Sequence, residues 1–173
     1  MPFKLCQQGI SLIEVLMAVL IFSVGLIGLA GLMVMAMRSN QAAYQRTQVT
    51  FLADGMVDRM RANPLGVWNG SYNDNGYPVS GRTNCESAAC TPASLATRDK
   101  QVWSSLLTTL LPNPAATIKC TAATSYTPST DHFNRRPPYG GHCAMTLSWS
   151  ERNAGDTTHS DTAKQTFAWE FQP

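Results

Sequence analysis

The hydrophobic pattern of the chain separates a polar start from a long apolar run. Residues 1–9 form a short polar leader, and from Val15 to Met37 the sequence carries no charge, with only Ser23 plainly polar. As a helix that rises about 1.5 Å per residue, this run spans about 34 Å, enough to cross a hydrocarbon core of about 30 Å. The pattern therefore predicts a transmembrane helix over residues 10–37.

Over residues 38–63 the same helix is expected to continue in amphipathic form. Proline disfavours the helical conformation of the residue before it, so Asn63-Pro64 is expected to end the helix. A globular head over residues 64–173 is expected to cover the apolar face of this rear half. The apolar positions recur with the spacing of one helical face: Val49, Leu52, Ala53, Met56, Val57 and Met60.

The sequence after the long helix predicts a loop and a second, shorter helix. Residues 68–81 are rich in Asn and Gly, which are turn-forming types, and are expected to form an exposed loop. A helix over about residues 92–111 is expected next, because Thr91-Pro92 places a favourable N-cap before a proline. Within this helix, Asp99 is expected to be a surface charge and Trp103 a core ring.

Three short runs then have the pattern of strands. The first covers residues 116–122, the second alternates apolar and polar positions from Cys143 to Ser150, and the third carries alternating aromatic residues near the end of the chain. Loops over residues 123–143 and 151–164 are expected to connect them. The predicted fold class is α+β, with a long N-terminal helix packed on a small antiparallel sheet head that includes the short second helix.

Composition argues against a nucleic-acid partner. The net charge is only +2, and loss of the leader would remove Lys4. The basic pair Arg135-Arg136 is interpreted as solvated surface in a Pro-rich loop. No nucleic acid is therefore expected among the partners.

The cysteines outside the leader form an even set, Cys85, Cys90, Cys120 and Cys143. In an oxidising compartment such a set predicts two disulfides, with three alternative pairings. We favour Cys85–Cys90 and Cys120–Cys143, because each closes a local loop. A zinc site from Cys120, His142 and Cys143 is the alternative, although the chain has no C-x2-C pair.

Candidate catalytic residues are lacking. His132, His142 and His159 fall in no recognisable nucleophile, metal or acid–base motif. The sequence Gly140-Gly141-His142-Cys143 leaves a thiol nucleophile open as an alternative. We expect no enzyme activity, no metal and no cofactor.

The start of the chain fits the ordinary targeting signals poorly. The apolar run is longer than the core of a secretory signal peptide, and Cys6 precedes the run, whereas a lipoprotein cysteine would follow it. A plain signal anchor fits the length but leaves Glu14 to be explained. Helix capping is one explanation, because Ser11-x-x-Glu14 has the form of a capping box and a carboxylate in the first turn suits the helix dipole.

The residues Gly9-Ile10-Ser11-Leu12-Ile13-Glu14 resemble the class III signal of type IV pilins and pseudopilins. That resemblance implies that a prepilin peptidase cuts between Gly9 and Ile10 on the cytoplasmic side and methylates the new amine of Ile10. Members of the family usually begin with Phe or Met, so Ile10 is a conservative departure. Glu14 becomes the fifth residue of the processed chain.

Glu14 stands at the edge of the apolar run, where a charge is expensive. A carboxylate inside a bilayer costs about 2.5–3.5 kcal/mol on insertion scales, and that cost falls when the anion meets a cation in the same apolar layer. The hypothesis is that Glu14 contacts the amine of Ile10 in a neighbouring subunit, which would set the register between stacked helices.

Two further blocks resemble the PilV group of minor pilins: the run from Asp58 to Pro64 and the region around Cys90-Thr91-Pro92-Ala93. This resemblance implies a low-abundance subunit of the type IV pilus that helps prime assembly and supports a tip complex for adhesion and twitching motility. The implied partners are prepilin peptidase, the major pilin, other minor pilins, the assembly platform in the inner membrane and a tip adhesin.

The resemblance also implies a location. The chain would cross the inner membrane once, with its N-terminus cytoplasmic and its head periplasmic, and would then enter the extracellular pilus. Two alternatives stay open: a pseudopilin of a type II secretion system, and a signal-anchored periplasmic domain of unknown activity.

Overall fold

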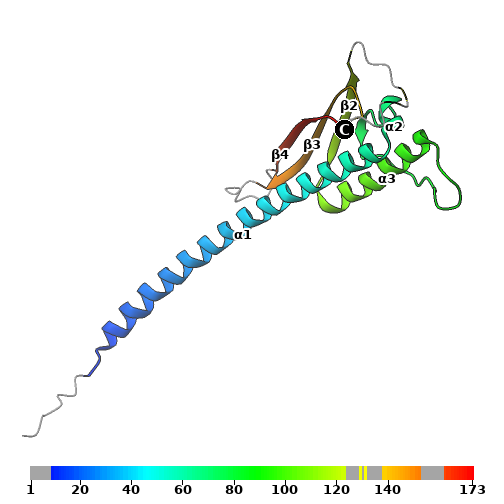
Figure 1. Cartoon of the computed structure of the whole chain (residues 1–173). Coiled ribbons are helices and arrows are strands. Elements are labelled where there is room, and N and C mark those ends of the chain that lie inside the picture. The colour runs from blue at the N-terminus through cyan, green and yellow to red at the C-terminus, as the bar shows by residue number, and fades with distance from the viewer. Residues whose placement is uncertain (1–8, 124–128, 130, 132–137, 153–161) are drawn as a thin grey trace, which may run out of the picture. The chain divides into compact units, whose positions relative to one another are not determined.

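The computed structural model describes residues 9–123, 129, 131, 138–152 and 162–173. The chain divides into two compact units, Met1–Gln41 and Ala42–Pro173. Most of the predicted leader, of the loop over residues 123–143 and of the last hairpin loop lies outside the described residues, as do Arg135, Arg136, His132 and His159. The elements in chain order are α1 (Leu12–Ala62), α2 (Pro64–Trp68), β1 (Asp74–Tyr77), α3 (Pro92–Leu110), β2 (Ala115–Ala122), β3 (Gly141–Arg152) and β4 (Thr162–Phe171) (Figure 1).

The first unit contains the front of α1, and its apolar side chains are exposed. The helix starts where the Ser11 carbonyl oxygen accepts hydrogen bonds from the backbone N–H groups of Glu14 and Val15, at 3.0 and 3.3 Å. By length and composition, α1 is the one helix among the described residues that could span a membrane. The large apolar side chains from Ile10 to Met37 are between 49% and 79% exposed.

In the second unit the rear of α1 buries the predicted apolar face. All six predicted positions have exposed fractions of 1% or less: Val49, Leu52, Ala53, Met56, Val57 and Met60. They belong to a core cluster that also takes side chains from α3 and from the sheet. The prediction of an amphipathic rear half is confirmed, and the core of the head is built on this face of the helix.

The sheet has four antiparallel strands in the order β1-β2-β3-β4. On β3, Cys143, Met145 and Leu147 are fully buried, as the predicted alternation requires. The last hairpin is longer than predicted. Residues 151, 152 and 162–164 were expected in its loop, but they lie in the strands, where Glu151 pairs with Ala163 and Arg152 with Thr162.

The prediction of an exposed loop over residues 68–81 is wrong in part, since residues 69–73 and 78–81 lie in no helix or strand, whereas the rest of the segment does. The segment begins at the end of α2, and it contains β1, which pairs with β2. Two tyrosines that bracket the Asn/Gly-rich turn are buried, Tyr72 at 0% and Tyr77 at 3% exposure. Tyr77 packs edge-to-face on Trp103 with ring centroids 5.0 Å apart. Aromatic burial therefore outweighs the local turn preference.

One asparagine side chain and one threonine side chain cap the N-termini of the two shorter helices. Asn63 caps α2, because its Oδ1 accepts from the backbone N–H of Gly66 at 3.2 Å. Thr91 caps α3 by accepting from the backbone N–H of Ser94 at 3.2 Å, and Pro92 follows as the first helical residue, as predicted.

α3 lies beside the rear of α1, as Figure 1 shows, and Trp103 connects the two helices. Its indole Nε1–H donates to the carbonyl oxygen of Leu52 at 2.8 Å, and its ring is buried. The prediction of a core ring at Trp103 is therefore confirmed. The prediction of a surface charge at Asp99 is wrong, because this residue is only 5% exposed.

Candidate functional site

The first candidate site is the segment that leads into α1. Gly9 and Ile10 precede the helix and are exposed, and a Cβ built on Gly9 would meet no atom within 4 Å. The peptide bond between them is therefore open to another molecule. No helical hydrogen bond would have to break for the chain to be cut there.

Glu14 lies in the first turn of α1 and is exposed. No salt bridge joins its carboxylate to a cation in the part of the chain that the structure describes. The carboxylate lies next to a continuous apolar surface. Water can solvate its charge only as long as this part of the helix lies in water. In an apolar layer it would need a partner from outside the described residues.

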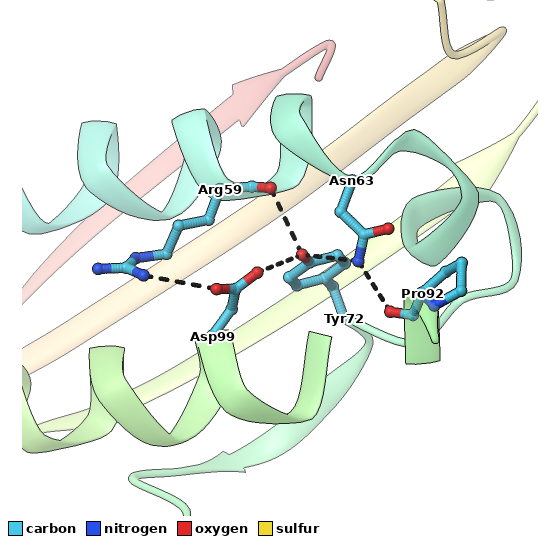
Figure 2. A network of polar contacts seen from close by, with 5 residues as sticks. All are labelled: Arg59, Asn63, Tyr72, Pro92 and Asp99. Atoms are coloured by element: carbon cyan, nitrogen blue, oxygen red, sulfur yellow. Dashed lines mark hydrogen bonds and ion pairs between the residues drawn. The ribbon is translucent and has the colours of Figure 1, made fainter. Parts of the chain in front are cut away.

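A second group of polar residues is buried where the end of α1 meets α3 (Figure 2). The Tyr72 hydroxyl donates to Oδ2 of Asp99 at 2.7 Å, and Nη1 of Arg59 lies 3.4 Å from Oδ1 of the same carboxylate. The Asn63 amide donates to the Tyr72 oxygen at 3.2 Å and to the carbonyl oxygen of Pro92 at 2.8 Å. This network satisfies the buried Asp99 and fastens the start of α3 to the end of α1.

The network is built to hold the helices together and is poorly suited to acid–base chemistry. Burial raises the pKa of Tyr72 above its ordinary value, and the hydrogen bond to Asp99 raises it further. The phenol therefore keeps its proton at neutral pH, and its side chain has no exposed surface. A substrate cannot reach it unless the joint between the end of α1 and the start of α3 unfolds.

Sequence reasoning did not find this network. Asp99 stands four residues before Trp103, so the two share one helical face. That spacing was the available signal for burial of Asp99. The contribution of Tyr72 carried no local signal, because its partner lies 27 residues further along the chain.

The cysteines form two disulfides, Cys85–Cys90 and Cys120–Cys143, which is the local pairing favoured from the sequence. Cys120 and Cys143 are direct partners across β2 and β3. Because both sulfurs are bonded, neither is a thiolate for zinc or a free nucleophile, which removes both alternatives for Cys143. Within the described ranges, no cluster of three or more His, Cys, Asp or Glu side chains could hold a metal.

Two family models match the chain. The model described as the prokaryotic N-terminal methylation motif matches residues 4–30, which include Gly9, Ile10 and Glu14. The model described as type IV pilin Tt1218 matches residues 31–101, which include Arg59, Tyr72 and Asp99 of the buried network. Together the matches cover more than half of the chain, and neither description names the PilV group. Comparisons with curated proteins and with solved structures gave no match.

Proposed function

This chain belongs to the type IV pilin family, and we propose that it is a minor subunit of a type IV pilus. The family match supports the role of a structural pilin or pseudopilin subunit, anchored in a membrane by its apolar helix. The observation that carries the proposal is the front of α1, where an uncharged apolar surface follows Gly9 and has Glu14 at its edge. A lone folded chain leaves that surface uncovered, so it needs lipid or like helices.

Processing is the first step of the proposal. Prepilin peptidase cuts between Gly9 and Ile10 at the cytoplasmic face and methylates the amine of Ile10. The exposed, non-helical backbone at both residues supports this step, because a peptidase must bind an extended chain. The methylation motif matched over residues 4–30 supports it as well.

Glu14 then acts in docking. The processed subunit presents a positive amine at Ile10, two residues before α1 begins, and a carboxylate at Glu14 in the first turn of α1. The carboxylate of one subunit contacts the amine of its neighbour, so that neither charge stays uncompensated in the apolar layer. This contact sets the axial register of the helices.

The remaining steps concern location and partners. The helix crosses the inner membrane once, the head lies in the periplasm, and the assembly platform moves the subunit into the extracellular fibre. There it joins the major pilin and other minor pilins, helps prime assembly, and supports a tip adhesin in the manner of the PilV group. No nucleic acid, metal or cofactor takes part.

Mass spectrometry of sheared pili tests the proposal. The expected result is a chain that begins at Ile10 with a methylated amine, present at a small fraction of the major pilin. A chain that still begins at Met1 in cells with an active prepilin peptidase contradicts the processing step. A processed chain found with a secretion apparatus and missing from pili favours a pseudopilin instead.

Substitution of Glu14 tests the docking step. For Glu14→Gln we expect incorporation into pili to fall by about tenfold, because a neutral amide loses the charge pair with the amine. The matched control is Ser23→Ala, since the Ser23 hydroxyl donates only to the Leu20 carbonyl of its own helix at 2.8 Å. Normal incorporation of the Gln variant contradicts the role of Glu14.

A further inference from the structure

A polar hollow lies between the segment 81–86 and one face of α3. Its volume is about 470 Å³, which falls in the size range of sites that bind small ligands and peptide side chains. Residues 81–84 and Glu86 line it on one side, and residues of α3 that include Arg98 and Gln101 line it on the other. The family match and the buried network assign no role to it.

Backbone and side-chain contacts fix the shape of the hollow. Oε1 of Gln101 accepts from the backbone N–H of Thr83 at 2.6 Å, which holds the segment against α3. Gly81 has a φ of 119°, a conformation that favours glycine, and so the chain turns towards α3 there. Further along the same segment, Oδ1 of Asn84 accepts from the backbone N–H of Glu86 at 2.8 Å, next to the Cys85–Cys90 disulfide. The hollow is therefore largely preformed.

The charges of the hollow favour an anion. Arg82 and Arg98 both line it, and neither guanidinium makes an ion pair or a hydrogen bond with the part of the chain that the structure describes. Glu86 is the one carboxylate among the lining residues. A guanidinium presents its N–H groups as a planar fork that matches a carboxylate, so two guanidiniums at one hollow form a natural carboxylate receptor.

We propose that this hollow binds an acidic segment of a partner protein, with Arg82 and Arg98 contacting a Glu or Asp carboxylate. The other lining groups suit a peptide, because the amide N–H groups of Asn84 and Gln101 can donate to backbone carbonyl oxygens. No aromatic ring is among the lining residues, so a sugar ring would have no face to stack on. The inference concerns the head alone and does not depend on whether the chain is a pilus or a secretion subunit.

The test uses the full chain in detergent micelles and fluorescence anisotropy of labelled peptides. The probe is a peptide of alternating Glu and Ser, and its matched partner has Gln in place of every Glu. We expect the Glu peptide to bind about tenfold more tightly than the Gln peptide. Binding should weaken as salt is added, because the contacting charges are partly exposed.

Variants that remove a positive or a negative charge from the hollow are expected to change binding in opposite directions. Arg82→Gln and Arg98→Gln should each weaken binding of the Glu peptide by about tenfold, whereas Glu86→Gln should tighten it by about threefold, since the repelling carboxylate is gone. The control Lys119→Gln removes the same charge as the arginine variants from an exposed position of β2, outside the hollow, and should leave binding unchanged. The thermal unfolding midpoints of the arginine variants should equal that of the unaltered chain.

Several results would overturn the proposal. Equal binding of the Glu and Gln peptides, or no binding of either, shows that the hollow does not select a carboxylate. A loss in Lys119→Gln as large as in Arg98→Gln shows a general effect of charge. Binding of an oligogalacturonate without binding of the Glu peptide assigns the hollow to acidic saccharides instead.

Discussion

The front and the rear of α1 carry the same kinds of apolar side chain, which are exposed in the front and buried on one face of the rear. Leu32 in the front is 65% exposed, and Leu52 in the rear is 1% exposed. Both lie in one continuous helix, so helix formation does not decide burial. The two halves differ in what packs against their apolar side chains. The rear half has the head of its own chain, and the front half has no cover in the described chain.

This difference separates the source of stability from the source of function. Each large apolar side chain that is fully buried in the head contributes about 1.5–3 kcal/mol relative to exposure. The large apolar side chains between Ile10 and Met37 are exposed, so they contribute no burial of this kind to the folded chain that the structure describes. Substitutions in the rear of the helix should therefore unfold the head, and those in the front should leave it folded and impair assembly.

The largest expected effect is on the rear helix face. Leu52→Ala should lower the free energy of unfolding by about 3–5 kcal/mol, because it leaves a cavity in the core. The neighbouring Phe51→Ala should change it by less than about 1 kcal/mol, since Phe51 is 63% exposed. Denaturant unfolding of the full chain in detergent, followed by near-UV circular dichroism, measures both.

A matched change in the front completes this test. Ile27→Ala removes apolar surface from an exposed position and should leave the unfolding midpoint of the head unchanged. A shift as large as that of Leu52→Ala would mean that the front half also stabilises the head, and the contrast between the halves would fail.

The next effect concerns the disulfides of the head. Replacing both Cys120 and Cys143 by Ala should cost about 3.5 kcal/mol in the chain-entropy model, against about 2 kcal/mol for Cys85 and Cys90, because the first pair closes the longer loop. The two cysteines of the first pair are 23 residues apart in the sequence, and those of the second pair are 5 residues apart. Urea unfolding of the two double variants gives the ranking, and a larger loss from the Cys85/Cys90 variant would contradict it.

A smaller effect is expected at the buried joint between α1 and α3. Asp99→Ala should cost about 2–3 kcal/mol, because the Tyr72 hydroxyl loses a charged acceptor and Arg59 loses its partner. Asp58→Ala is the control, since Asp58 pairs with Arg61 on the surface at 3.7 Å and such pairs contribute at most about 1 kcal/mol. Equal losses in the two variants would show that Asp99 behaves as a surface charge after all.

The contrast also explains how far the sequence could be interpreted alone. The buried face of α1 was predicted residue by residue, because helical periodicity carries that information locally. The start of α3 was predicted from Thr91-Pro92, and the alternation on β3 from period two. In each case the signal lies within a few residues of the feature.

The features that the sequence did not predict depend instead on partners far along the chain. The segment with Tyr72 and Tyr77 has turn-forming neighbours, and its rings are buried by contacts with residues far along the chain, including Asp99 and Trp103 of α3. The buried carboxylate of Asp99 is compensated by Arg59, 40 residues earlier in the chain. Such partners are set by the fold. The N-terminal motif lies between these cases: Gly9, Ile10 and Glu14 are recognisable from sequence, but their proposed partners belong to other molecules.

The smallest expected effect is the loss of one hydroxyl in the joint. Tyr72→Phe should cost about 1–1.5 kcal/mol near neutral pH, where it removes the hydrogen bond to Asp99. Tyr44→Phe is the control, because Tyr44 is exposed on α1 and should change nothing. Unfolding free energies of the two variants and the unaltered chain at pH 8 provide the comparison.

The pH dependence of this variant gives the sharper result. Burial, above all, raises the pKa of Tyr72 and of Tyr77 in the folded chain above the ordinary value near 10. Above about pH 10 the unfolded chain therefore loses these protons first, and each tyrosine lowers the unfolding free energy by up to about 1.4 kcal/mol per pH unit. Tyr72→Phe removes one of the two contributions, so its stability should fall less steeply between pH 10 and 11. An unchanged slope would mean that the Tyr72 phenol ionises as easily in the folded head as in water, which a hydroxyl buried against Asp99 cannot do.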